Sequence, residues 1–170
     1  MQTYIALLRA VNVGGTGKLP MVELKAMCEE IGFSAVKTYI ASGNVLFKSP
    51  LAEAEVRQAL EARLLAYAGK PVGVITRKPE GMAAALAANP FPGEAPNRTL
   101  VTFLNDPPPA DTITRARHHM DEQIVLGDRE IYIFYGDGMA GSKLQVPAAA
   151  LGTSRNINTV TKLVAMADAL

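Results

Sequence analysis

Cysteine is almost absent from the sequence. Cys28 is the only cysteine among 170 residues, which excludes a disulfide framework and a metal site built from thiolates alone. Cys28 lies in an apolar pattern of helical spacing, which favours a small core residue over a nucleophile. We therefore expect a reduced, cytoplasmic protein.

An excess of charge of one sign is also missing. The chain has 17 basic and 16 acidic residues, for a formal net charge of +1. Proteins that bind nucleic acid in bulk usually carry a clear basic excess, because neutralising phosphates drives their affinity. The balance disfavours nucleic acid as a partner, although it leaves room for a local basic patch.

Long apolar runs are the third absence. No run approaches the ~20 residues of a membrane span, so no membrane partner is predicted. The apolar run from Tyr4 to Leu8 has no basic region ahead of it and is interrupted by Arg9, which indicates a strand rather than a signal peptide. Because this strand is apolar on both faces, we expect both faces to be covered.

The first half has the pattern of a ferredoxin-like unit. We predict strands over 4–13, 36–41, 45–48 and 72–77, and helices over 21–31 and 51–68. The order is strand, helix, strand, strand, helix, strand. Gly32 and Gly69 end the helices, and Gly43-Asn44 is the signal for a two-residue hairpin turn.

The second half repeats this order in part. We predict a short helix after Pro79 through Met82 to Ala88, a strand over 98–105, and a helix that follows Pro107-Pro108-Pro109 and ends near His119. A hairpin of 123–126 with 130–135, a helical start over 142–151 and a final helix over 159–170 complete the half. The predicted fold class is therefore α+β, with two ferredoxin-like halves in a pseudo-duplicated arrangement and a C-terminal helix. The boundaries are 1–79 and 80–170, and we expect the halves to pack as one compact unit.

The glycine-rich loop after the first strand nearly matches a nucleotide-binding P-loop and fails at two positions. Asn12 stands where the first glycine is required, and Leu19 stands where a hydroxyl must bind Mg²⁺. A second glycine-rich segment, 136–143, has its Ser and Lys in reversed order. Loop amides, a helix N-terminus and a lysine still suit an anion. The alternative, that the glycines only permit tight turns, stays open.

The polar segment before the final helix offers a second cation. Asn156 or Asn158 would cap the helix, but a cap does not account for Arg155. An arginine fixed beside a helix start suits an oxyanion.

Other chemistry is poorly supported. His118 and His119 are adjacent, so on a helix they point about 100° apart and cannot share an ion. The acidic pair Asp121-Glu122 has the pattern of a solvated face. The RNA-binding signature of open ferredoxin-like sheets is not matched by Val45–Lys48. We therefore predict no metal and no cofactor, and the sequence specifies no reaction.

Four motifs carry a family resemblance. They are Tyr4-Ile5-Ala6-Leu7-Leu8-Arg9-Ala10-Val11-Asn12-Val13-Gly14-Gly15, Tyr39-Ile40-Ala41-Ser42-Gly43-Asn44-Val45-Leu46-Phe47, Ser142-Lys143-Leu144 and Arg155-Asn156-Ile157-Asn158-Thr159-Val160-Thr161-Lys162-Leu163. With them the whole chain resembles the bacterial family called domain of unknown function 1697. The resemblance implies an α+β protein of two ferredoxin-like halves and implies no activity. Ala10 replaces the usual Gly of the family pattern, and Ile157 replaces the usual Trp.

These observations favour a protein that binds a small anionic, phosphate-bearing ligand. Arginines would contact the anion, lysines would add mobile charge, and loop amides and polar side chains would orient the ligand. The predicted ligand-binding residues are Arg9, Asn12, Gly14, Gly15, Lys18, Ser42, Asn44, Lys143, Arg155 and Asn156. Two alternatives are single-stranded RNA binding and a protein-interaction module without catalysis. The oligomeric state is not predicted.

Overall fold

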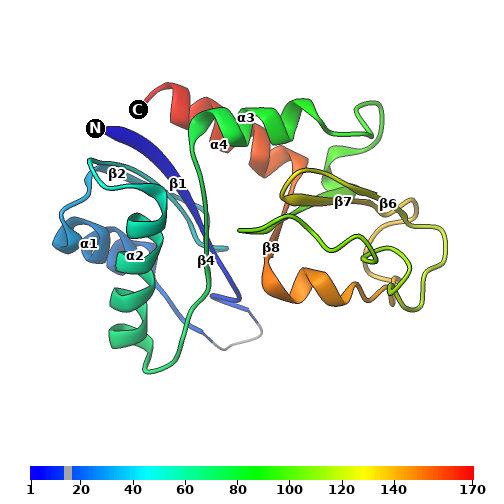
Figure 1. The fold of residues 1–170 in the computed structure, drawn as a ribbon, viewed down its shortest axis with the longest axis horizontal. Helices are drawn as coiled ribbons and strands as arrows, with labels where there is room; N and C mark the ends of the chain where they lie inside the picture. Colours follow the sequence, from blue (N-terminus) through cyan, green and yellow to red (C-terminus); the bar gives the residue numbers. More distant parts are fainter. Residues whose placement is uncertain (14–16) are drawn as a thin grey trace. The chain divides into compact units, whose positions relative to one another are not determined.

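The structure, a computed structural model, describes residues 1–13 and 17–170. These residues form two compact units. The first unit consists of Met1–Met82 together with Leu163–Leu170, and the second of Ala83–Lys162. Figure 1 shows the elements along the chain. Their order is β1 (Gln2–Leu8), α1 (Met21–Ile31), β2 (Ser34–Tyr39), β3 (Asn44–Ser49), α2 (Glu53–Ala68), β4 (Val74–Arg77), α3 (Pro79–Ala87), η1 (Pro96–Arg98), β5 (Thr99–Phe103), β6 (Gln123–Leu126), β7 (Glu130–Phe134), η2 (Pro147–Leu151), β8 (Thr153–Asn156) and α4 (Ile157–Asp168), where η denotes a short 3₁₀ helix.

The first unit contains a four-stranded antiparallel sheet in the order β2-β3-β1-β4. This is the strand order of the ferredoxin-like fold, so the predicted fold class is confirmed for this half. The helices α1 and α2 contact each other, and they also contact β2 and β4 respectively. Both helices end as predicted, with Gly32 and Gly69 in the left-handed conformation that glycine adopts without strain.

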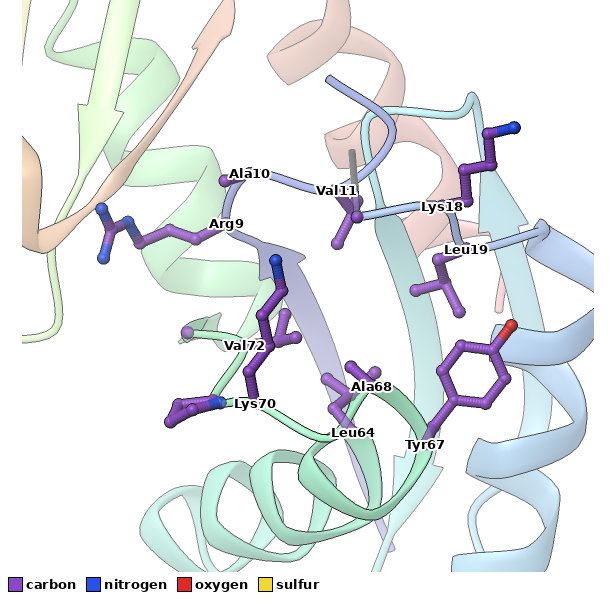
Figure 2. Close-up of a pocket in the computed structure, with 13 residues that line it drawn as sticks. Arg9, Ala10, Val11, Lys18, Leu19, Leu64, Tyr67, Ala68, Lys70 and Val72 are labelled. Carbon is purple, nitrogen blue, oxygen red and sulfur yellow. The ribbon is translucent and has the colours of Figure 1, made fainter. Parts of the chain in front are cut away.

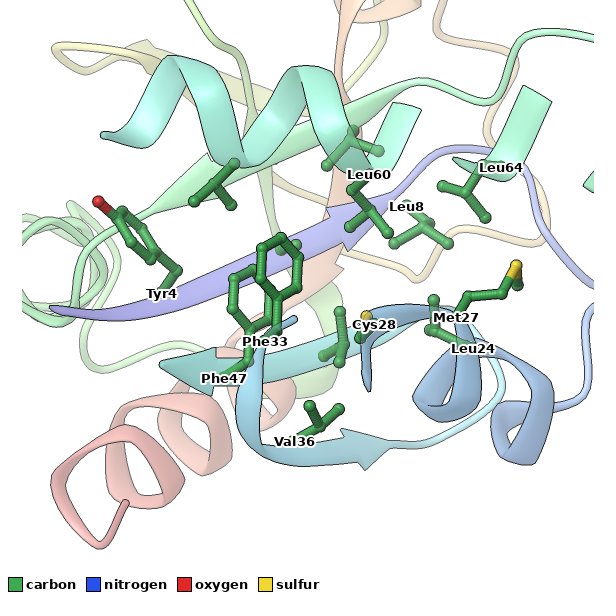
Figure 3. Packing of buried hydrophobic residues seen from close by; sticks show 14 of the residues in the cluster. Tyr4, Leu8, Leu24, Met27, Cys28, Phe33, Val36, Phe47, Leu60 and Leu64 are labelled. Carbon is green, nitrogen blue, oxygen red and sulfur yellow. The ribbon is translucent and has the colours of Figure 1, made fainter. Parts of the chain in front are cut away.

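The core of the first unit lies between this sheet and its two helices (Figure 3). Phe33 and Phe47 stack with their ring centroids 4.1 Å apart, and Leu60 of α2 is fully buried in the same cluster. The predicted burial of both faces of β1 is confirmed, because every side chain from Tyr4 to Leu8 has an exposed fraction of 0%. Cys28 is buried in this core, and burial raises the pKa of its thiol to about 12.

Two boundaries in the first unit were predicted wrongly. The strand β1 ends at Leu8 rather than Val13, because Ala10 and Asn12 have φ of 54° and 55°, which an extended strand cannot contain. The turn between β2 and β3 is the four-residue loop 40–43, because Tyr39 pairs with Asn44. Asn44 is therefore a buried strand residue and not part of the turn.

The second unit repeats the sheet of the first. Its antiparallel order is β6-β7-β5-β8, so β5 takes the place of β1, and β8 takes the place of β4. The strands β6 and β7 form the predicted hairpin. The strand β8 was not predicted, although its four residues complete the duplicated sheet.

Two predicted helices of the second half are wrong. The segment after Pro109 forms turns, because the hydroxyls of Thr112 and Thr114 donate to the carbonyls of Pro109 and Asp111 and compete with the helix. The segment predicted as helical from Ser142 contains only η2.

The C-terminal helix α4 begins at Ile157, two residues before its predicted start. Asn156 is its cap, because its Oδ1 accepts a hydrogen bond of 2.9 Å from the backbone N–H of Thr159. Val160, Leu163 and Ala167 are buried along one face of the helix.

Candidate functional site

A cavity of about 600 Å³ lies in the first unit where β1 ends (Figure 2). Its walls come from the segment after β1, the last turn of α2 and the segment that leads into β4. The lining residues are Arg9, Ala10, Val11, Gly17, Lys18, Leu19, Leu64, Tyr67, Ala68, Lys70, Pro71, Val72 and Gly73.

The pairing of β1 with β4 brings these segments together. Leu8, the last residue of β1, pairs with Val74, the first residue of β4. The next residue along, Arg9, donates its backbone N–H to the carbonyl of Gly73 at 2.9 Å. The segment after α2 therefore lies beside the segment after β1, and this places Lys70 in the same cavity as Arg9.

The cavity is lined by cations and by no acidic side chain among the described residues. Arg9, Lys18 and Lys70 contribute three positive charges in a chain whose net charge is only +1. In Figure 2, Lys70 points across the cavity toward Ala10, whereas Arg9 and Lys18 extend in opposite directions. Both Arg9 and Lys18 are exposed, so their charged groups can move toward a ligand.

The remaining wall is apolar. Val11, Leu19 and Leu64 are buried members of the core cluster, with exposed fractions of 4%, 3% and 1%. Tyr67, in the last turn of α2, keeps 41% of its surface exposed. The cavity thus combines a buried apolar wall with exposed positive charges.

Gly73 leaves space for the side chain of Arg9. A Cβ atom added to Gly73 would lie 3.1 Å from Cδ, 3.5 Å from Cβ and 3.6 Å from Cγ of Arg9. The first of these distances is tighter than ordinary van der Waals contact. The absence of a side chain at Gly73 therefore sets the path that Arg9 takes out of the sheet.

Asn12 fixes the segment after β1. Its Nδ2 donates to the carbonyls of Leu19 (2.9 Å) and Ala41 (2.7 Å), and its Oδ1 accepts from the N–H of Leu19 at 2.8 Å. Its backbone N–H donates to the carbonyl of Gly17. These bonds engage both amide hydrogens of the side chain, so Asn12 ties the chain after β1 to Gly17, Leu19 and Ala41. The prediction that it also contacts a ligand stays a prediction.

Ser42 and Asn44 organise the loop between β2 and β3. The Nδ2 of Asn44 donates to the carbonyl of Tyr39 at 2.8 Å and to Oγ of Ser42 at 3.0 Å. Gly43 between them has a φ of 92°, and an added Cβ would lie 2.7 Å from Cγ2 of Val11. Neither Ser42 nor Asn44 lines the cavity, and their role in ligand binding stays a prediction.

Three predicted residues belong to the second unit. Arg155 lies on β8 and is buried, and its Nη1 donates to Oγ1 of Thr153 (2.8 Å) and to the carbonyl of Ser154 (2.9 Å). Burial lowers the pKa of its guanidinium to about 10. Asn156 caps α4, and Lys143 is exposed. Their participation in one site with Arg9 stays a prediction, and Gly14 and Gly15 lie outside the described residues.

Lys70 and Tyr67 were missed by the sequence analysis. The signal was present, because the predicted ferredoxin-like order places the start of the fourth strand beside the end of the first. Because the first strand was predicted to run to Val13 rather than to Leu8, the predicted order did not bring the residues just before 72 beside Arg9. The predicted site residues lie instead at the two glycine-rich loops, at the hairpin and just before the final helix.

The second unit has its own cavity, of about 710 Å³, with acidic walls. Glu122 lies there with its carboxylate accepting hydrogen bonds from Oγ of Ser142 (2.6 Å) and from the N–H of Met120 (2.8 Å). These hydrogen bonds, of which the one from Ser142 has the largest effect, lower the pKa of the Glu122 carboxyl group. The prediction of a solvated face is wrong for this residue, which is 5% exposed. Within 1–13 and 17–170, no three His, Cys, Asp or Glu side chains cluster as metal ligands would.

The fold and the cavity define an α+β protein with a duplicated ferredoxin-like sheet and a cationic cavity in its first half. The family model described as "Protein of unknown function (DUF1697)" matches residues 1–132, and the chain belongs to this family. A solved structure, that of a conserved bacterial protein from Streptococcus pneumoniae, is similar over 98% of both chains, with 25% sequence identity and a TM-score of 0.80. No functionally curated protein matches the chain. None of the helices in the described part of the chain has the length and apolar character to cross a membrane.

Proposed function

We propose that the cavity at the end of β1 binds a small phosphate-bearing ligand. The observation that carries this proposal is the combination of Arg9, Lys18 and Lys70 with the absence of any acidic side chain among the described lining residues. A concave site lined by one sign of charge concentrates ligands of the opposite sign. Arginine adds a planar group that can donate two parallel hydrogen bonds to a phosphate.

The negative end of the α2 helix dipole opposes this attraction but is weaker than it. The cavity adjoins the C-terminal end of α2, which carries a partial negative charge of roughly half an electron. Lys70 follows the cap residue Gly69 and offsets that charge locally. Two full positive charges, on Arg9 and Lys18, then remain for a ligand.

The test is a titration with inorganic phosphate at constant ionic strength, followed by calorimetry and by thermal unfolding. At about 100 times its Kd, a ligand stabilises the native state by roughly 2.7 kcal/mol, which for a chain of this size raises Tm by about 5–10 °C. Arg9→Gln and Lys70→Gln should each reduce this shift. Lys25→Gln, at an exposed position of α1 outside the cavity, removes the same charge and should leave the shift unchanged.

Two results would contradict the proposal. One is the absence of any shift at millimolar phosphate. The other is an equal reduction in all three variants, because that would assign the effect to net charge rather than to the cavity. Tight, sequence-selective oligonucleotide binding at physiological salt would instead favour the RNA-binding alternative.

A further inference from the structure

The cavity is much larger than the anion that its charges attract. A water molecule occupies about 30 Å³ in the liquid, so 600 Å³ corresponds to roughly twenty water volumes. Inorganic phosphate has five non-hydrogen atoms and would leave most of this volume to solvent. A ligand that fills the cavity therefore carries a body larger than its phosphate.

The side chains of the walls offer few partners to a body rich in hydroxyl groups. Among the described lining residues, the polar side chains are those of Arg9, Lys18, Lys70 and Tyr67, and no Ser, Thr, Asn, Gln, Asp or Glu is present. A hydroxyl group taken out of water without a hydrogen-bond partner is unfavourable. A sugar phosphate would find only these four polar side chains and the exposed backbone groups as partners for its several hydroxyls.

The same walls suit a flat apolar body. Leu64 and Tyr67 are three residues apart on α2, so they are neighbours on one helix face. Leu64 is buried, while the ring of Tyr67 is 41% exposed at the cavity. An aromatic ring offers its face to any planar group, and stacking on such a ring contributes substantially to ligand affinity. Figure 2 shows Leu19, Leu64 and Tyr67 on the side of the cavity opposite Arg9.

We propose that the ligand is a phosphate ester of a planar aromatic or heteroaromatic ring. The ring lies against Tyr67, and the phosphate faces Arg9 and Lys70. This assignment rests on the proposed function and adds the chemical class of the organic part of the ligand.

The experiment compares inorganic phosphate, ribose 5-phosphate and 1-naphthyl phosphate by calorimetry on the full chain at constant ionic strength. We expect 1-naphthyl phosphate to bind at least about tenfold more tightly than inorganic phosphate. Ribose 5-phosphate should gain no more than about twofold, because its hydroxyls find no partners. Arg9→Gln should weaken all three ligands.

Variants at Tyr67 then measure the contribution of its aromatic ring to binding separately from that of the positive charges. Because Tyr67 is partly exposed, its replacement should leave the fold intact. Tyr67→Ala should weaken 1-naphthyl phosphate at least about fivefold and leave inorganic phosphate unchanged. Tyr67→Phe keeps the ring without its hydroxyl and should bind 1-naphthyl phosphate as the wild type does.

The outcomes distinguish the two proposals. If inorganic phosphate binds through Arg9 but 1-naphthyl phosphate binds no better, or ribose 5-phosphate gains as much, the ring assignment is wrong and the anion site stands. If 1-naphthyl phosphate binding survives in the Arg9→Gln/Lys70→Gln double variant, the ring binds elsewhere and the assignment is also wrong. If no phosphate compound binds, both proposals fail together.

Discussion

Replacing Gly73 by Ala tests the anion site without removing a charge. The new Cβ would lie 3.1 Å from Cδ of Arg9, a few tenths of an ångström inside the usual contact limit of 3.4 Å. Gly73 has no positive φ, so alanine is compatible with its backbone. The contact is relieved most easily by moving the side chain of Arg9, because that side chain is exposed at the end of the sheet. The side chain of Arg9 is then pushed off its present path, which limits how its guanidinium can approach a phosphate in the cavity.

The magnitude follows from the contact that is lost. A hydrogen bond to a charged group contributes about 1.5–3 kcal/mol, which corresponds to roughly 10- to 150-fold in Kd. Complete loss is the effect expected for Arg9→Gln, so Gly73→Ala should weaken inorganic phosphate by about fivefold or more without exceeding Arg9→Gln. Stability should be unchanged or rise by up to about 1 kcal/mol, because alanine restricts the unfolded chain.

Calorimetric titration with phosphate and chemical denaturation provide the two measurements. Gly93→Ala is the matched control, because an added Cβ there meets nothing within 4 Å and its φ is not positive. Equal phosphate affinity in Gly73→Ala and Gly93→Ala would refute the reasoning, since Arg9 would then not need the space that Gly73 provides. A large loss of stability in Gly73→Ala would refute it as well, because the strain would then fall on the backbone.

Three further predictions concern the fold. Gly43→Ala places a Cβ 2.7 Å from Cγ2 of Val11 and should lower the free energy of unfolding by about 2–4 kcal/mol. Gly32→Ala is also at positive φ but has open space around it, so it should lower the free energy of unfolding by only about 1 kcal/mol. Equal denaturation midpoints for the two variants would contradict the contact with Val11. Ala10 has a φ of 54°, which glycine adopts without strain, so Ala10→Gly should raise the free energy of unfolding by about 0.5–1 kcal/mol in denaturant. A loss of stability would show that the conformation of Ala10 is not strained. The pKa of Glu122 is lowered in the folded state, so its stabilisation is complete above the ordinary value of 4.5 and is lost as the pH falls through the folded pKa. The difference in unfolding free energy between wild type and Glu122→Gln should therefore shrink in acid, and a difference that stays constant down to pH 2 would contradict the assignment.

The parts of the fold that local sequence determines were predicted well. Helices α1 and α2 follow from apolar residues at helical spacing and from the glycines that end them. The fully apolar run of β1 identified a strand covered on both faces. In each case the deciding interactions lie within a few residues of one another.

The parts that depend on distant partners were predicted poorly. Thr153–Asn156 is polar and short, and it is a strand only because it pairs with β5, some fifty residues earlier. The helix expected after Pro109 fails because threonine hydroxyls bond to nearby carbonyls, a choice that spacing alone does not reveal. Of the cations that line the cavity, Arg9 and Lys18 were proposed from the chain, whereas Lys70 is placed there by the register between β1 and β4.

The division of the chain has a consequence for its synthesis. The first unit consists of residues 1–82 and 163–170, and both termini lie in it (Figure 1). On a ribosome, residues 83–162 are made before the last piece of that unit exists. At about 5–20 residues per second, those 80 residues take roughly 4–16 s. For that time the nascent first unit lacks Leu163 and Ala167, both of which are buried in the finished protein.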